Sequence, residues 1–108
     1  PNEQGGAQGM SEDAGRIELE ESDSKGRYFF RGPDGAVAEM TFSKVGDAMI
    51  IIDHTEVPDA FRGQGIGLKL VTRAVEDMRA AGKKIIPLCP FANAQFRRHG
   101  EWADVLKH

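Results

Sequence analysis

Three glycines spaced two residues apart, Gly63, Gly65 and Gly67, form the stretch of this 108-residue chain that most directly suggests chemistry. They follow an apolar run and precede an amphipathic one, where a strand would turn into a helix. The first backbone N–H groups of a helix have no partner within it, and the helix dipole adds partial positive charge there. Glycine lets a ligand come close because it has no Cβ, and Arg62 adds a guanidinium group beside the turn. The pattern predicts a site for a phosphate-bearing ligand.

The strands that would position this turn are predicted from the spacing of apolar residues. Before the glycines, apolar residues recur in four short runs, which predict strands over residues 16–21, 27–31, 36–44 and 48–57. Short turns rich in Gly, Asp and Ser separate the runs. The four strands should therefore pair as an antiparallel meander.

After the glycines the period of the pattern changes. From residue 67 to 81, apolar residues recur at three- and four-residue steps, which predicts a helix that packs on the sheet and ends at Gly82. Residues 83–88 predict a fifth strand, parallel to the fourth because a helix connects the two. A short helix over 90–99 and a last helical turn around Trp102 complete the chain. The expected fold class is α+β, with a mixed five-stranded sheet.

Composition and charge limit the classes of protein that fit. Residues 1–15 bury too little apolar surface to offset their ordering entropy, so we expect a disordered segment followed by one domain over 16–108. A formal charge of -3 argues against a general nucleic-acid binder, which usually carries a basic face. No apolar run reaches the ~20 residues of a membrane span. The single cysteine excludes an internal disulfide and a multi-cysteine zinc site, and it favours a reducing, cytoplasmic setting.

Several segments together resemble the GNAT superfamily of acyl-CoA-dependent N-acyltransferases. Residues 62–67, Arg-Gly-Gln-Gly-Ile-Gly, fit its Arg/Gln-x-x-Gly-x-Gly/Ala signature in a strand-to-helix context. The segments around the signature fit as well: Val57-Pro58, Phe61, Asn93-Ala94, Phe96 and Gly100. The short chain, with 54–58 read as His-Thr-Glu-Val-Pro and 89–91 as Cys-Pro-Phe, is similar to the small single-domain subgroup of this superfamily.

The resemblance implies acetyl-CoA as the cofactor, with no metal. Backbone N–H groups around residues 64–67 would bind the diphosphate of coenzyme A, and the pantetheine arm would lie like an added strand where the fourth and fifth strands part. The competing interpretation is a plain turn with no ligand. Asn93 would bind pantetheine or a backbone carbonyl, and a helix N-cap is the competing interpretation, which is compatible with that role. The cofactor-binding residues implied are Val57, Arg62, Gly63, Gln64, Gly65, Ile66, Gly67, Asn93 and Phe96.

Acyl transfer to an amine needs a neutral amine, a polarised thioester carbonyl and a proton for the leaving thiolate. His54 and Glu56 are two residues apart on the fourth strand, so their side chains should share one face. Either could accept the amine's proton, His54 more readily because imidazole titrates nearer neutral pH than a carboxylate does. A solvated carboxylate for Glu56 and a structural role for His54 are the competing interpretations.

The resemblance also places the acetyl thioester beside Cys89, at the end of the fifth strand. There the thiol fits three roles: a nucleophile that carries a transient acetyl group, an acid for the leaving thiolate, or a small apolar filler. Buried cysteines are commonly inert, which favours the filler on chemistry alone. The catalytic candidates are therefore Cys89, His54 and Glu56.

Two departures from the superfamily pattern bear on function. Many members place a proton-donating tyrosine where this chain has Phe96, and Tyr28 on the second strand is a poor substitute. The proton would come from Cys89, His54 or water, or transfer would be slow. Larger members also have helices between the first two strands, whereas residues 21–27 here predict only a turn. The acceptor site should be open, which suits a protein lysine or a polyamine.

The leading function is therefore acetyl-CoA-dependent N-acetyl transfer to an amine. An acyl-CoA-binding module with little or no catalysis is the alternative. A nucleotide-binding P-loop is excluded because its Gly-x-x-x-x-Gly-Lys-Ser/Thr motif is absent.

Overall fold

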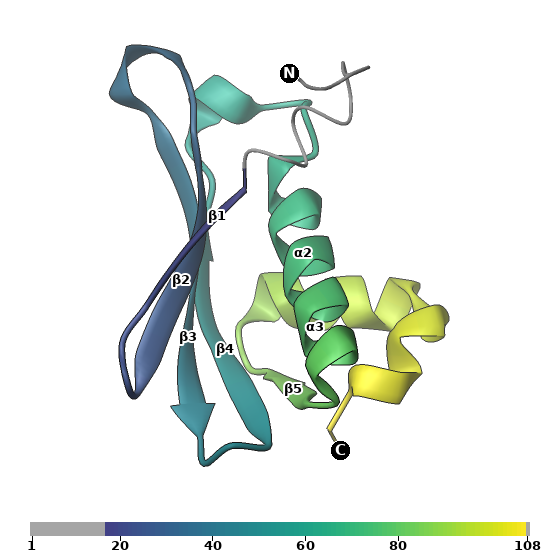
Figure 1. Cartoon of the computed structure of the whole chain (residues 1–108). Coiled ribbons are helices and arrows are strands. Elements are labelled where there is room, and N and C mark those ends of the chain that lie inside the picture. The colour runs from purple at the N-terminus through teal and green to yellow at the C-terminus, as the bar shows by residue number, and fades with distance from the viewer. Residues whose placement is uncertain (1–16, 108) are drawn as a thin grey trace, which may run out of the picture.

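The computed structural model describes residues 17–107, which form a five-stranded sheet with helices on one side (Figure 1). The disorder expected for residues 1–15 lies outside the described residues. The strands follow one another across the sheet in chain order. They are β1 (Glu18–Glu21), β2 (Lys25–Arg31), β3 (Val37–Val45), β4 (Met49–Glu56) and β5 (Lys84–Pro87). The first four pair antiparallel and β4 pairs parallel with β5, so the predicted sheet is confirmed.

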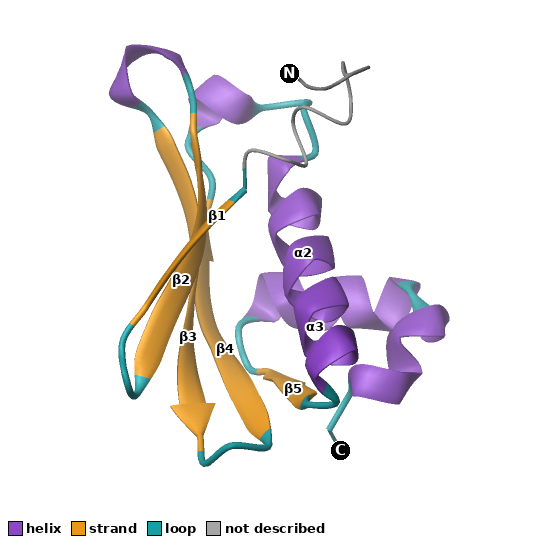
Figure 2. Cartoon of the chain, in the orientation of Figure 1, coloured by secondary structure: helices purple, strands orange, loops and turns teal. Residues whose placement is uncertain are grey.

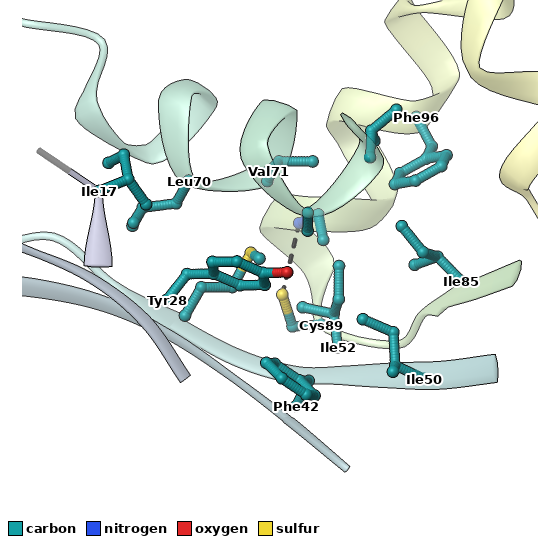
Figure 3. Close-up of a cluster of buried hydrophobic side chains, with 14 of the residues drawn as sticks. Ile17, Tyr28, Phe42, Ile50, Ile52, Leu70, Val71, Ile85, Cys89 and Phe96 are labelled. Carbon is teal, nitrogen blue, oxygen red and sulfur yellow. Dashed lines mark hydrogen bonds between the residues drawn. The ribbon is translucent and has the colours of Figure 1, made fainter. Parts of the chain in front are cut away.

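Two helices pack on one face of this sheet. Helix α2 (Ile66–Ala81) ends at Gly82, which has a φ of 71° and so adopts the left-handed conformation expected of it. Helix α3 (Pro90–Arg98) crosses beside it, and a 3-10 helix over Gly100–Val105 follows. Their apolar side chains and those of the sheet form one buried cluster, part of which is drawn in Figure 3.

The opposite face of the sheet carries ion pairs. Phe29 on this face is only 3% exposed, because the guanidinium groups of Arg27 and Arg31 lie 4.2 and 5.1 Å from its ring centroid. Both guanidinium groups are held by carboxylates of neighbouring strands: Glu18, Glu20 and Glu39. In Figure 2, α2 and α3 both lie on the other side of the sheet, and we call the face that neither of them covers the open face.

A bulge interrupts β4 near its end. Phe42 of β3 lies opposite Ile52, but the preceding Thr41 lies opposite His54, which leaves Asp53 as an extra residue. An extra residue in one strand shifts the alternation of its side chains relative to the partner strand. Asp53 is held by the hydroxyl of Ser43, which donates a hydrogen bond of 2.7 Å to its carboxylate.

The bulge decides which side chains face the helices. Thr55 lies opposite Met40, which is fully buried in the core, so Thr55 points toward the helices. His54 and Glu56 lie opposite Thr41 and Glu39, and their side chains point to the open face. They share one face, as the two-residue spacing predicts.

A partly buried hydrogen-bond network ties the first strands to α2. The Tyr28 hydroxyl donates a 2.8 Å hydrogen bond to the Asp77 carboxylate, which also accepts from Arg73 at 3.1 Å. Arg73 donates in turn to the carbonyl of Ile17 at 2.8 Å. Burial, and then the hydrogen bond to Asp77, raise the pKa of Tyr28 above its usual value. This hydroxyl is therefore engaged at α2, which agrees with the view that Tyr28 is a poor proton donor for catalysis.

The raised pKa of Tyr28 predicts a loss of stability in alkaline solution. A group whose pKa is higher in the folded state stabilises the fold below its unfolded pKa, and that contribution is lost as pH rises through the folded value. The free energy of unfolding of the wild-type protein should therefore fall as pH rises above about 10. Tyr28→Phe should lower the free energy of unfolding by about 1 kcal/mol at pH 7. As pH rises above 10, the free energy of unfolding of this variant should fall less than that of the wild type. Urea denaturation at several pH values measures this, and parallel pH curves for the two proteins would contradict it.

Candidate functional site

One aromatic side chain anchors the glycine turn to the hydrophobic core. Phe61 ends the 3-10 helix Asp59–Phe61, is 1% exposed and packs edge-on against Phe30 with centroids 5.5 Å apart. A Cβ on Gly32 would lie 2.2 Å from the ring of Phe61, so the hairpin between β2 and β3 closes over this ring. The turn is thus fixed to the core at the point where it leaves β4.

The shape of the turn requires glycine at two positions. Gly63 and Gly65 have φ values of 79° and 69°, in the left-handed region that L-residues with a side chain rarely adopt. Gly65 precedes α2, and no side chain caps the helix there. The N–H groups of its first three residues, 66–68, have no hydrogen-bond acceptor within residues 17–107. A set of unpaired N–H groups at the positive end of a helix favours an anion.

A hollow of about 370 Å³ lies beside these N–H groups. Two guanidinium groups line it, from Arg62 on the turn and Arg98 on α3. A Cβ on Gly67 would lie 2.7 Å from the ring of Phe91, so this glycine lets α3 approach the start of α2. The residues around the hollow are Val57, Phe61, Arg62, Gly63, Gly65, Ile66, Gly67, Leu68, Phe91, Gln95 and Arg98.

Six of the nine predicted binding residues line this hollow and three do not. The side-chain amide of Gln64 donates to the carbonyl of Ala60 at 3.3 Å. Phe96 lies in the core at 6% exposure and packs against Trp102, with centroids 5.2 Å apart. The structure therefore places the Phe96 side chain in the hydrophobic core and not on the hollow.

Asn93 is the third of these residues. Its side chain donates to the carbonyl of Pro87 at 3.4 Å, which is one of the partners expected for it. The alternative that Asn93 caps α3 is wrong. The cap is Cys89, whose Sγ accepts a hydrogen bond from the N–H of Ala92 at 3.4 Å.

A gap opens between β4 and β5 next to Cys89. Their pairing ends at Ile52 and Pro87, and the N–H of Cys89 makes a last hydrogen bond of 3.1 Å to the carbonyl of Ile52. β4 continues to Glu56. Within residues 17–107, no strand pairs with the edge of residues 53–56 that faces away from β3. An amide-bearing ligand can add to such an edge as an extra strand would.

At this gap, the catalytic candidates lie on the two opposite faces of the sheet. Cys89 is 5% exposed on the helix side, and its Sγ lies 3.3 Å from the hydroxyl of Thr55 (Figure 3 shows Cys89 beside Ile52). His54 and Glu56 are exposed on the open face. No hydrogen bond between described residues joins either of them to Cys89. Sequence reasoning missed Thr55, because only the bulge turns it toward the thiol.

A second hollow, of about 660 Å³, lies on the open side and reaches the bulge in β4. Its lining residues come from the first four strands: Glu20, Glu21, Ser22, Lys25, Gly26, Arg27, Thr41, Phe42 and Asp53. Thr41, one of these lining residues, lies opposite His54 in the strand register.

Residues 17–107 contain neither a cluster of metal ligands nor a helix that could span a membrane. No group of three or more His, Cys, Asp or Glu side chains in this range is arranged to hold a metal ion. Over the same residues, no helix has the length and apolar character needed to cross a bilayer.

The sequence is similar to a family of known proteins and to individual relatives. Residues 27–105 match the family model of the GCN5-related N-acetyl-transferases. Protein NATD1 of Xenopus tropicalis is 39% identical over 67 residues, or 56% of this chain and 62% of the relative. Protein NATD1 of Bos taurus is 42% identical over 48 residues, or 40% of this chain and 42% of the relative. The chain thus matches less than two thirds of the length of either curated relative.

Solved structures are similar over most of the chain. One, determined by NMR, is a protein from Staphylococcus aureus assigned as a GCN5-like N-acetyltransferase. It is 33% identical with a TM-score of 0.65, over 85% of this chain and 89% of its own. A crystal structure of a protein from Agrobacterium tumefaciens assigned as an acetyltransferase is 22% identical with a TM-score of 0.52, over 92% of this chain and 81% of its own. At that identity the second likeness shows the fold alone.

Proposed function

Because this chain belongs to the GCN5-related N-acetyltransferase family, we propose that it transfers the acetyl group of acetyl-CoA to an amine. The observation that carries the proposal is the start of α2. Its unpaired N–H groups, two positive-φ glycines and two nearby guanidinium groups meet at one hollow. That donor set suits a diphosphate.

The residues present fit coenzyme A along a continuous path. The N–H groups of residues 66–68 would hold the diphosphate, and Arg62 and Arg98 would balance its charge. Val57 lines the same hollow and directly follows β4, whose unpaired edge leads to Cys89. The amides of the pantetheine arm would hydrogen-bond that edge. When bound, acetyl-CoA supplies the activated acetyl group as a thioester at the gap between β4 and β5.

The chain's own residues would manage the protons of the reaction. On the open face, His54 or Glu56 would take a proton from the acceptor amine. On the helix side, Cys89 would give a proton to the leaving thiolate, or would itself carry the acetyl group before passing it to the amine. Thr55 would orient the thiol through its 3.3 Å contact. Phe96 has no proton to give and lies in the core, so it takes no part in this step.

The acceptor would approach the open face of the sheet. Within residues 17–107, neither α2 nor α3 lies over that face, and the 660 Å³ hollow there is lined by Thr41, the residue opposite His54. A lysine on an exposed protein segment, or a polyamine, would reach the gap without entering an enclosed pocket. We therefore propose an exposed primary amine as the acceptor class.

The experiment that tests this function supplies acetyl-CoA with an isotope-labelled acetyl group to mixtures of candidate acceptors. Lysine-rich peptides, polyamines and amino sugars are incubated in separate arms. Labelled acetyl groups on a peptide or polyamine, with release of free coenzyme A thiol, support the proposal. Turnover confined to amino sugars contradicts the open acceptor site. Tight binding of acetyl-CoA without turnover in any arm favours the alternative, an acyl-CoA-binding module, to which the phenylalanine at position 96 also points.

A further inference from the structure

Gln95 on α3 has a buried side chain whose amide has no partner. Gln95 is 8% exposed. Among residues 17–107, it is the only buried residue with an amide or charged side chain. Its backbone carbonyl accepts hydrogen bonds from the N–H and from Nδ1 of His99, at 3.1 and 2.8 Å. No hydrogen bond to its side-chain amide is formed by any residue from 17 to 107. A buried amide without partners is unfavourable, so such a group in a folded protein calls for a physical reason.

The position of Gln95 suggests that reason. Phe91, Gln95 and Arg98 lie four and three residues apart on α3, hence on one side of the helix, and all three line the 370 Å³ hollow. Phe91 touches Gly67 at the start of α2. Gln95 is four residues after Phe91, and four residues of helix rise by about 6 Å. Gln95 therefore lies one helical turn beyond the contact between Phe91 and Gly67, farther from Cys89. It lies between the apolar contact and the guanidinium group of Arg98.

Gln95, with its unpaired amide, therefore lines the same hollow as residues 66–68, whose N–H groups are unpaired. An anion held on those N–H groups has further acceptor oxygens to offer to the α3 side of the hollow. A glutamine NH₂ group donates two hydrogen bonds and accepts none, which suits such an oxygen. The two sets of unsatisfied donors are complementary to one ligand group.

We propose that Gln95 is a coenzyme-binding residue whose side-chain NH₂ donates a hydrogen bond to the diphosphate held at the start of α2. The inference rests on the proposed function, because it takes coenzyme A as the ligand of this hollow. It adds a side-chain donor from α3 to a site otherwise made of main-chain N–H groups and guanidinium groups. The amide is satisfied only in the complex, so it favours binding over the free state.

Gln95→Met tests the proposal because methionine has nearly the same volume and no amide. Removing an unpaired buried amide should leave the melting temperature of the free protein equal to or above that of the wild type. The affinity for coenzyme A should fall by about tenfold, which corresponds to about 1.4 kcal/mol. A residue that served only to pack the core would change stability and affinity in the same direction.

Two fragments of the ligand identify the group that Gln95 contacts. ADP carries a diphosphate without the pantetheine arm, and pantetheine carries the arm without phosphate. Calorimetry or NMR titration at millimolar concentration should show that Gln95→Met weakens ADP binding severalfold and leaves pantetheine binding unchanged. Gln95→Glu keeps the shape but replaces the donor by a carboxylate, and it should weaken binding of coenzyme A further, increasingly so as pH rises.

Three results would overturn the proposal. The first is binding of coenzyme A by Gln95→Met within twofold of the wild type. The second is a loss of affinity for pantetheine with none for ADP, which would place the contact on the arm. The third is no binding of coenzyme A by the wild-type protein, which would overturn the proposed function as well. The first two leave the proposed function intact, so the two failures are distinguishable.

Discussion

Replacing Gly65 with valine is expected to weaken the binding of coenzyme A by at least about a hundredfold. Gly65 has a φ of 69°, and a β-branched residue strongly disfavours that conformation. The turn would therefore shift, and the N–H groups of residues 66–68 would no longer converge on the diphosphate. Hydrogen bonds to a charged group contribute about 1.5–3 kcal/mol each, so losing two of them gives a factor of this size. Isothermal titration calorimetry with coenzyme A measures it directly.

Gly82 offers a matched control at the other end of the same helix. Its φ and ψ of 71° and 28° nearly equal the 69° and 24° of Gly65, and it lies far along α2 from the hollow. A Cβ at either glycine would meet nothing within 4 Å. Gly82→Val should therefore lower the melting temperature about as much as Gly65→Val and leave the affinity for coenzyme A within twofold. Equal losses of affinity in both variants would show that backbone strain at either end of α2 weakens binding, and that the shape of the glycine turn has no specific role.

Replacing Cys89 with serine is expected to lower kcat by about a hundredfold with little change in the dissociation constant of acetyl-CoA. General acid or nucleophilic catalysis by a single side chain contributes typically about 10²–10⁴-fold. A serine hydroxyl gives up its proton far less readily than a thiol and is a weaker nucleophile. Serine also caps helix N-termini well, so the hydrogen bond from Ala92 that now ends on Sγ should be kept. Steady-state kinetics and calorimetry on the same preparation separate kcat from binding.

Stability and covalent state complete the test of Cys89. The melting temperature of Cys89→Ser should stay within a few degrees of the wild type, so that the loss of kcat cannot be attributed to unfolding. Intact mass spectrometry after mixing with acetyl-CoA, without an acceptor, decides between the two catalytic roles. An acetyl adduct on wild-type protein and none on Cys89→Ser indicates the carrier role, and no adduct on either indicates proton donation. An unchanged kcat would leave Cys89 as a structural residue.

Much of the fold could be predicted from the sequence because periodicity and turn residues agree there. The three- and four-residue spacing after Gly67 predicted a helix to residue 81, and α2 ends at Ala81 with Gly82 left-handed. The strand that precedes the turn was predicted over residues 48–57 and spans Met49–Glu56. The parallel fifth strand followed from the helical connection alone, since such crossovers return to the same sheet.

The details of the site could be predicted only in part, because they depend on tertiary contacts. The bulge at Asp53 leaves no mark in the alternation of residues 48–57, so the turn of Thr55 toward Cys89 was missed. The N-cap of α3 could have been predicted correctly from the sequence. Proline favours the first helical position, so Pro90 indicates that Cys89 is the cap and that Asn93 is not. Gln95 gave no signal, since a glutamine in an amphipathic helix is ordinary until its burial and its missing partner are known.

The central claim is that main-chain donors at the start of α2 bind the cofactor. Titration of ¹⁵N-labelled protein with coenzyme A, followed by amide chemical shifts, tests it most directly. The amide signals of Gly65, Ile66, Gly67 and Leu68 should move most and saturate with the dissociation constant found by calorimetry, while that of Gly82 stays in place. If coenzyme A binds and these four signals do not move, the cofactor lies elsewhere on the molecule and the claim is wrong.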